Sequence, residues 1–211
     1  MGDDGALYVA ADVVPVYQAI IPFADIILPN QFEAELLSLC KIDSLDSIVT
    51  CLKTLHAIYR VAHIVISSIR LESHPNVILC CGSTATSSLE PRPFVLEVPI
   101  VDGPFVGTGD LFAALLLIRL HPYTGRLVPH DQVSANDLPL AKALELVIAS
   151  MQGVLKNTKL AMDREEKKNG NREVQSERER HVQTMRAAEL RLVGSQKALL
   201  HPEVAALVVP L

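Results

Sequence analysis

The sequence predicts an α/β fold in which a mostly parallel sheet is flanked by helices. Short apolar runs that end at turn-forming residues alternate with longer segments whose apolar residues recur at helical spacing. Hydrophobic residues make up 49% of the 211 positions and charged residues 20%, which is the composition of a globular chain. We therefore expect one α/β domain with a sizeable core.

The expected elements alternate along the first two thirds of the chain. Strands are predicted at residues 7–9, 24–28, 63–67, 77–81 and 94–98. Helices are predicted at residues 12–21, 31–39, 44–59, 110–120 and 137–160. Asp12, Ser44 and Asp137 are the expected N-terminal caps, and the apolar helix segment 111–120 is expected to be buried nearly all round.

The character of the sequence changes at residue 163. Residues 163–180 are dense in acidic and basic side chains of mixed sign, with Asn169-Gly170-Asn171 in the middle. This pattern predicts a solvated, poorly ordered insertion. The expected organisation is a main segment at 1–162, the charged insertion at 163–186, and a C-terminal segment at 187–211 that packs back on the same domain.

Composition argues against several classes of protein. The formal charge is −5, which gives no overall attraction to nucleic acid or to an anionic membrane surface. No apolar run is long enough to span a bilayer, and the first residues lack the pattern of a secretion signal. The four cysteines form no CxxC pair and are expected to be reduced thiols. A cytoplasmic protein is the expectation.

The tetrapeptide Gly107-Thr108-Gly109-Asp110 is the first candidate for chemistry. Its two glycines allow a tight turn directly before a helix, where unpaired backbone N–H groups carry partial positive charge. Such a turn is suited to hold charge that develops on a transferring phosphoryl group, and Asp110 beside it is placed to accept a proton. The alternative is a glycine turn with an aspartate cap before a core helix.

A second motif is Asn30-Gln31-Phe32-Glu33. Asn30 and Glu33 lie three residues apart at the start of a predicted helix, so their side chains point toward the same end. An amide and a carboxylate there suit hydrated Mg²⁺ and nucleotide phosphates. The alternative is a capping box, which uses the same two residue types. Ser67, at a strand end, and Asp3 are weaker candidates for phosphate or metal contact.

These motifs resemble those of the pyridoxal kinases. Residues 24–37 resemble the family's NxxE segment, residues 105–117 resemble its anion-hole helix, and residues 7–17 and 189–193 are also similar. The resemblance covers nearly the whole chain except the charged insertion. It implies a ribokinase-like α/β fold, here partial, and ATP-dependent phosphorylation of the 5′-hydroxymethyl group of pyridoxal, pyridoxine or pyridoxamine.

The resemblance also implies roles for individual residues. Asp110 is the expected base, and the amides of Gly107, Thr108 and Gly109 are the expected anion hole. The expected ATP-binding residues are Asn30, Glu33, Ser67, Val101, Asp102 and Phe105. Glu33 and Asp3 are the expected metal contacts. The implied cofactors are ATP and Mg²⁺, with a monovalent cation as a further candidate, and the implied partner is a small-molecule vitamer, with a homodimer left open.

Two departures from the family pattern bear on activity. Leu28 stands where the family usually has threonine, and Met1-Gly2-Asp3 resembles the end of a family segment rather than its start. We expect the N-terminal half, which carries most of the vitamer pocket in the family, to be missing. The alternative function is therefore a catalytically impaired nucleotide-binding fragment or truncated isoform.

Overall fold

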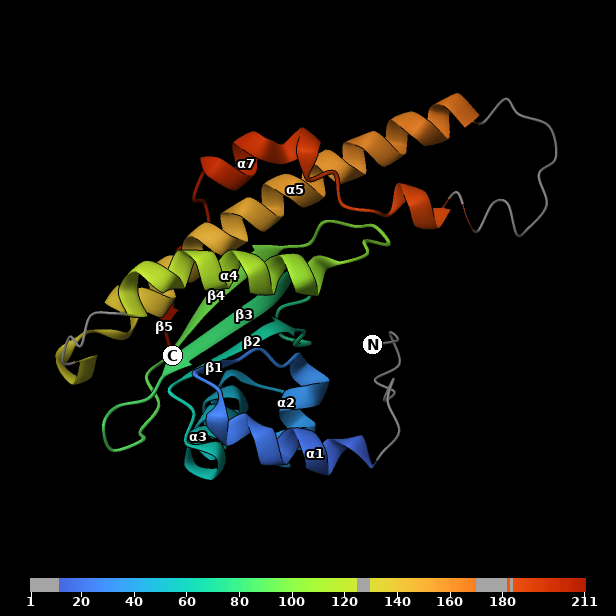
Figure 1. Cartoon of the computed structure of the whole chain (residues 1–211). Helices are drawn as coiled ribbons and strands as arrows, with labels where there is room; N and C mark the ends of the chain where they lie inside the picture. Colours follow the sequence, from blue (N-terminus) through green and yellow to red (C-terminus); the bar gives the residue numbers. More distant parts are fainter. Residues whose placement is uncertain (1–11, 125–129, 170–181, 183) are drawn as a thin grey trace. The chain divides into compact units, whose positions relative to one another are not determined.

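The structure is a computed structural model that describes residues 12–124, 130–169, 182 and 184–211 (Figure 1). The chain divides into two compact units. We call Met1–Pro99, Arg126–Lys142 and Leu207–Leu211 the sheet unit, and Ile100–Gly125 and Ala143–Ala206 the helical unit. Each unit is described by itself.

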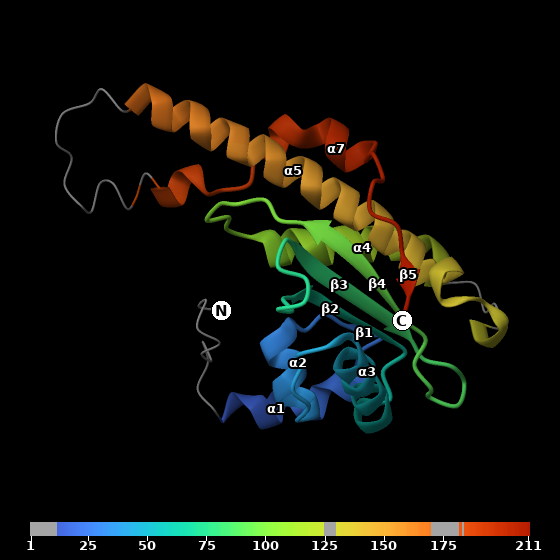
Figure 2. The same ribbon diagram turned by 180° about the vertical axis from the view of Figure 1, so that it is seen from behind.

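The sheet unit is built on a five-stranded sheet with the order β1-β2-β3-β4-β5 (Figure 2). The strands are β1 (Ile26–Ile27), β2 (His63–Ile69), β3 (Val77–Thr84), β4 (Pro93–Pro99) and β5 (Val209–Pro210). Strands predicted within residues 24–98 are confirmed in place. The strand predicted at residues 7–9 lies outside the described residues.

The strand directions differ from the expectation of a mostly parallel sheet. Of the four pairings in the described sheet, β1 with β2 is parallel, and the pairings β2–β3, β3–β4 and β4–β5 are antiparallel. The prediction was wrong here because the chain between β2 and β3 and the chain between β3 and β4 contain no helix. A parallel connection needs a crossover of a dozen or more residues, whereas short connections join antiparallel neighbours.

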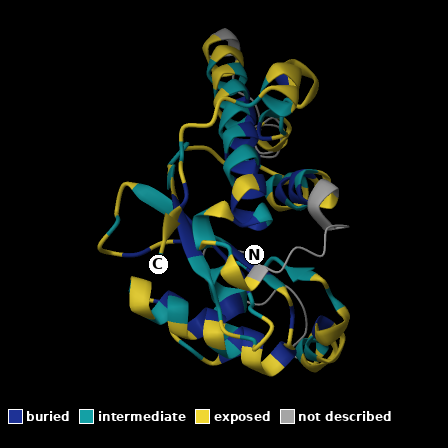
Figure 3. Ribbon diagram, turned by 90° about the vertical axis from the view of Figure 1, so that its left-hand side faces the viewer, coloured by how far each residue is buried: buried dark blue, intermediate teal, exposed yellow. Residues whose placement is uncertain are grey.

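Helices α1 (Val13–Ile20), α2 (Gln31–Ser38) and α3 (Leu45–Tyr59), with the short 3₁₀ helix η1 (Ile21–Phe23), lie together on one side of this sheet (Figures 1 and 2). Ile48, Leu52, Leu55 and Tyr59 on α3 are buried, as their helical spacing predicts. They share one core cluster with apolar residues of β2 and β3. Figure 3 shows buried positions along the strands and exposed positions recurring along the helices.

Helix α1 is confirmed near its predicted bounds but is poorly covered. Asp12 stands at its N-cap without a side-chain capping hydrogen bond, in contrast to the expectation, because its own backbone is already helical. No residue of α1 is buried. Tyr17 and Ile20 are more than half exposed, and Phe23 in η1 is 89% exposed. The sheet unit thus presents an apolar helix face to solvent.

The helical unit contains α4 (Thr108–Thr124), most of α5 (Pro139–Asn169), η4 (Val193–Ser195) and α7 (Gln196–Leu200). On α4, Phe112, Leu115, Leu116 and Leu120 form a buried stripe at helical spacing. Leu117 and Ile118 are each 68% exposed, so the prediction that this helix is buried nearly all round was wrong. Apolar side chains occur on all faces of this helix, but packing buries only one stripe of them.

Helix α5 is longer than predicted, and it contains residues 163–169 of the expected insertion. Side-chain pairs help to explain this continuation. The Lys159 Nζ lies 3.0 Å from the Asp163 Oδ1 at i,i+4 spacing. The Arg191 Nη2 lies 2.8 Å from the Glu165 Oε1. The expected boundary after residue 162 therefore falls inside a helix, while residues 170–181 lie outside the described part of the chain.

A close approach joins α5 to α7 in the helical unit. A Cβ atom at Gly153 would collide with the Cβ of Ala198, so glycine is needed for the two backbones to lie this near. Arg119 of α4 donates to the carbonyl of Leu199 at 2.7 Å.

Across the described residues, no helix is long and apolar enough to cross a membrane.

The cysteines are free, as predicted, and three of the four are buried. Burial raises the pKa of Cys51 to about 11 and that of Cys80 to about 12, so both are protonated at neutral pH.

His56 is a buried imidazole of the sheet unit. Its Nδ1 lies 2.8 Å from the Val61 carbonyl oxygen and its Nε2 lies 2.9 Å from the Ser83 hydroxyl.

His56 should make stability depend on pH. The Val61 carbonyl only accepts, so Nδ1 carries the proton and Nε2 accepts from Ser83 in the neutral ring. Burial lowers the pKa of His56 below its ordinary value of 6.5. The free energy of unfolding should be fully retained above pH 6.5 and should fall as pH drops below 6.5, because the unfolded chain then binds the proton more readily.

Urea unfolding at several pH values checks this, with His56→Asn as the control because its amide keeps a donor near Val61 without titrating. The stability difference between the wild type and His56→Asn should shrink on acidification. A difference that stays constant from neutral to acidic pH would contradict the lowered pKa.

Candidate functional site

Asn30 and Glu33 form a complete capping box at the start of α2. The Asn30 Oδ1 accepts from the backbone N–H of Glu33 at 2.9 Å, and the Glu33 Oε2 accepts from the backbone N–H of Asn30 at 3.0 Å. Two N–H groups that a helix start leaves without partners are thereby satisfied. The capping alternative raised by the sequence is therefore confirmed as geometry, and any role in binding must coexist with it.

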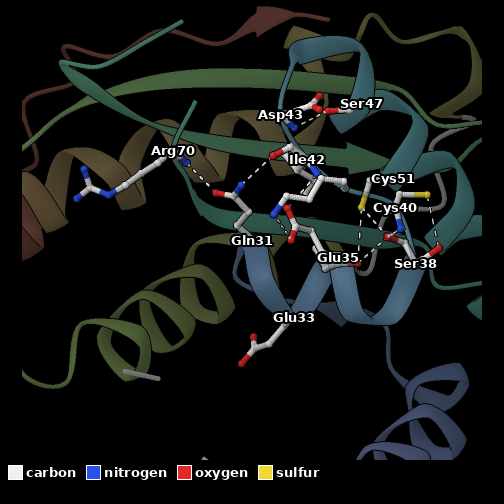
Figure 4. Close-up of polar contacts among 12 residues, drawn as sticks. Gln31, Glu33, Glu35, Ser38, Cys40, Ile42, Asp43, Ser47, Cys51 and Arg70 are labelled. Carbon is white, nitrogen blue, oxygen red and sulfur yellow. Dashed lines mark hydrogen bonds and ion pairs between the residues drawn. The ribbon is translucent and has the colours of Figure 1, made fainter. Parts of the chain in front are cut away.

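The residues next to this box lock the surrounding loops. Gln31 donates to the Ile42 carbonyl at 3.0 Å and accepts from the Arg70 backbone N–H at 3.0 Å. Glu35 accepts from the Ile42 backbone N–H at 2.9 Å. In Figure 4 these side chains converge on the loop that follows α2, whereas Glu33 points away from them. The Glu33 carboxylate is held instead by the bond that it accepts from the Asn30 N–H.

Ser67 lies beside this helix start. Its backbone N–H donates to the carbonyl of Pro29, the residue before Asn30, at 3.2 Å. The β2–β3 register shifts between Ile66 and Ile69, a stretch that contains Ser67. Bulges re-aim side chains and recur next to active sites. The structure therefore brings Ser67 and the Asn30–Glu33 pair together where the parallel strands β1 and β2 end, the usual address of ligands in open α/β sheets.

The glycine tetrapeptide forms the predicted turn at the start of α4. Gly107 adopts a φ of 83°, in the left-handed region that favours glycine, and α4 begins at Thr108. The Leu111 N–H donates to the Gly107 carbonyl at 3.1 Å, which closes the first helical turn. The amides of Thr108, Gly109 and Asp110 precede that first bond, so they have no partner within the helix.

Asp110 is exposed in the first turn of α4. Among the residues that the structure describes, its side chain makes no hydrogen bond or ion pair. It therefore differs from Glu33, whose carboxylate caps its own helix at the same position of the turn. The capping alternative has no such support at α4, where the Asp110 side chain is exposed.

The segment that leads into this turn is held by the protein backbone. A side chain at Gly103 would meet the Phe105 ring at 2.7 Å, so the ring folds back over Gly103. Val106 forms a parallel bridge with Glu189, and its N–H donates to the Ala188 carbonyl at 3.1 Å. Val101 and Phe105 are half-buried and Asp102 is exposed.

Lys159 of α5 forms an ion pair with Asp163. The Lys159 ammonium donates a hydrogen bond to the Asp163 carboxylate, which raises the pKa of Lys159, with smaller contributions from the charges of Glu166 and Asp102. Asp102 is one of the residues expected on the nucleotide side. The sequence offered no signal for Lys159, because it lies in a helix far along the chain among many other charged residues.

The Glu33 carboxylate suits Mg²⁺ as a single protein ligand, with waters and substrate phosphates as the others. Among the described residues, no group of three or more His, Cys, Asp or Glu side chains is placed to hold a metal ion. Mg²⁺ is usually held through one or two carboxylates, waters and substrate phosphates instead of a closed protein cage. One Glu33 oxygen serves the cap, and an ionised carboxylate has about four acceptor sites. Asp3, the other expected ligand, lies outside the described residues.

Comparison with known proteins adds a family to this geometry. No protein-family model matches the sequence. A putative pyridoxal kinase of Schizosaccharomyces pombe is 36% identical over 159 residues, which are 75% of this chain and 50% of the relative. The pyridoxal kinase of Arabidopsis thaliana is 31% identical over 206 residues, 97% of this chain and 57% of the relative. The chain belongs to the pyridoxal kinase family.

Solved pyridoxal kinases share the fold. One from Leishmania donovani, in complex with ADP and pyridoxamine, matches the whole chain with a TM-score of 0.74 at 26% identity, and the chain covers 60% of it. The predicted ribokinase-like α/β fold is confirmed, with the correction to strand direction given above. The chain spans about half the length of the curated pyridoxal kinases that it matches.

Sequence reasoning missed the residues that support the pyridoxal kinase motifs. Thr158 and Asn157 of α5 bind residues 191 and 195, and Gln31 ties α2 to the end of β2. A lone Thr or Asn in a helix gives no signal, because its partner lies more than thirty positions away in the chain. For residues 188–191, the family resemblance of 189–193 was the available hint.

The capping box should carry a measurable share of stability. Asn30→Ala removes the acceptor for the Glu33 N–H and should lower the free energy of unfolding by about 1 kcal/mol. Asn30→Asp keeps an acceptor oxygen and should leave stability nearly unchanged. Chemical unfolding followed by circular dichroism measures both. Equal stability of the two variants would show that the box contributes nothing.

Proposed function

We propose that this chain carries phosphoryl-transfer machinery of the pyridoxal kinase type, which phosphorylates the 5′-hydroxymethyl group of pyridoxal, pyridoxine or pyridoxamine with ATP. The observation that carries the proposal is the left-handed Gly107 turn opening α4, with the Asp110 carboxylate exposed beside it and without a partner among the described residues. The relatives and solved neighbours named above support the substrate class.

The Gly107 turn supplies the anion hole. Phosphoryl transfer spreads negative charge over the oxygens of the moving group, and catalysis is mostly positioning and electrostatic stabilisation. The amides of Thr108 and Gly109, at the positive end of α4, meet that charge with fixed donors. No side chain at Gly107 or Gly109 stands in the way of a phosphate group.

Asp110 acts as the base. Its carboxylate accepts the proton of the vitamer hydroxyl as that oxygen attacks the γ-phosphorus, so the proton moves to Asp110 while ADP leaves. The absence of a capping bond leaves both carboxylate oxygens to accept. Val101, Asp102 and Phe105, on the segment before the turn, are proposed to contact the nucleotide.

Asn30, Glu33 and Ser67 hold the metal–nucleotide complex. Mg²⁺, when bound, neutralises charge on the ATP phosphates. Glu33 would hold the ion with the carboxylate oxygen not used by the cap, Asn30 would keep Glu33 in place, and Ser67 would contact the phosphates. Asp3 as a second metal contact, a monovalent cation, a homodimer and a cytoplasmic location are further parts of the proposal.

A second candidate is nucleotide binding without efficient phosphorylation. The chain spans about half the length of its curated relatives, and none of the residues assigned a role above holds the vitamer ring. Positioning of the acceptor supplies several kcal/mol of barrier reduction, and its loss leaves slow turnover. ATP binding without pyridoxal-dependent ADP formation would favour this candidate.

Asp110→Asn should strongly slow turnover without disturbing the fold. Loss of a general base lowers kcat by about 100-fold or more. Asp46→Asn is the matched control, since Asp46 is also an exposed carboxylate in the first turn of a helix. The readout is pyridoxal-dependent ADP formation. Equal rates for wild type and Asp110→Asn would exclude Asp110 as the base, and a wild type without turnover would leave the second candidate.

Glu33→Gln separates capping from metal binding. Glutamine also completes a capping box, so stability should hold, while loss of the charge should raise the KM for Mg–ATP by about tenfold, equivalent to about 1.4 kcal/mol of binding. Glu33→Ala should lose both. Initial rates over a titration of Mg–ATP measure the effect. An unchanged KM in Glu33→Gln would reduce Glu33 to a cap.

A further inference from the structure

The backbone that leads into the Gly107 turn is fixed from a distant part of the sequence. The Val106 N–H donates to the Ala188 carbonyl at 3.1 Å, and Val106 pairs with Glu189 in a parallel bridge. Ala188 is fully buried. The contacts with residues 188–189 therefore fix the position of the turn. These residues follow the charged stretch at 163–186.

Residues 188–191 are in turn held by α5. The Arg191 N–H donates to the Thr158 hydroxyl at 3.1 Å, and that hydroxyl donates to the Val154 carbonyl at 2.8 Å. Thr158 is fully buried. A hydroxyl that only bonded back to its own helix would give α5 no hold on another segment, but the Thr158 hydroxyl uses its donor within the helix and an acceptor site outside it.

Two neighbouring contacts extend this hold. Asn157 donates to the Ser195 hydroxyl at 3.2 Å, and Glu165 pairs with the Arg191 guanidinium at 2.8 Å. Figure 2 shows the C-terminal segment returning along α5. The Arg191–Glu165 pair is exposed and contributes little. The Thr158 hydroxyl is buried, and the loss of its part-buried bond leaves the Arg191 N–H without its partner. Thr158 is the principal link.

We propose that Thr158 is a positioning residue for the phosphate-binding turn. It anchors Arg191, which holds the Ala188 carbonyl against Val106, and so it sets the direction of the amides that follow Gly107. The inference rests on the proposed function, since it assigns Thr158 to the same turn. A turn that shifts should lose complementarity to the charge of the transition state more than affinity for the ground state.

The test compares Thr158→Val with Thr158→Ser. Valine keeps the shape without the hydroxyl, and serine restores the hydroxyl. In Thr158→Val, hydrogen exchange of the Val106 amide should rise about tenfold and kcat should fall on the order of tenfold with KM values nearly unchanged, while Thr158→Ser recovers both. Thr50→Val is the matched control, since the Thr50 hydroxyl also bonds back along its helix, to the Asp46 carbonyl.

The outcomes are distinct. Unchanged Val106 exchange in Thr158→Val overturns the proposal, as does a uniform rise that includes β2 and β3 amides, because that rise marks general destabilisation. Exchange does not require turnover. If the wild type forms no ADP with pyridoxal, the proposed function fails, and the positioning role is then decided by Val106 exchange alone.

Discussion

The first backbone N–H groups of an α-helix have no partner within the helix, and two helices of this chain meet that constraint in opposite ways. At α2, the Asn30 and Glu33 side chains satisfy two of the N–H groups at the helix start. At α4, Gly107 supplies a left-handed backbone and no side-chain acceptor, so the amides that follow it lack a capping side chain from this position. A satisfied helix start is a rigid platform, and an unsatisfied one is an anion-binding site. The division of labour proposed for the two motifs follows from that difference.

The platform and the turn also differ in how they are supported. Around α2, the contacts are local in the fold: Gln31 and Glu35 bind Ile42 and Arg70, all in the sheet unit. The α4 turn depends on a relay through residues 188–191 to α5 in the helical unit. A turn without capping side chains of its own needs such support. Its glycines leave the backbone accessible but restrain its conformation less than other residues would.

Local signals in the sequence predicted local structure well. Ser44 caps α3 as expected, Asn30 caps α2 as the alternative given for its motif, and the buried face of α3 follows from its spacing. Asp137 does not cap α5 as expected, because it lies in the 3₁₀ helix η3 (Ala135–Asp137) and α5 begins only at Pro139. The direction of β3 and β4 was missed because strand–helix alternation was given more weight than the short connections between these strands. The exposed Leu117 and Ile118 were missed because hydrophobicity indicates what can be buried, and packing partners decide what is. Thr158 was missed because its partner is distant in sequence.

The two glycines of the α4 turn are subject to different constraints. A Cβ atom at either would meet no described atom within 4 Å, so crowding excludes a side chain at neither position. At Gly107 the exclusion is one of handedness: an L-residue at this φ carries a strain of about 1–2 kcal/mol, whereas a D-residue would carry none. Gly109 has no such positive φ. The described residues leave open space at Gly109, so its backbone is accessible to the phosphate group that the proposal places at this turn.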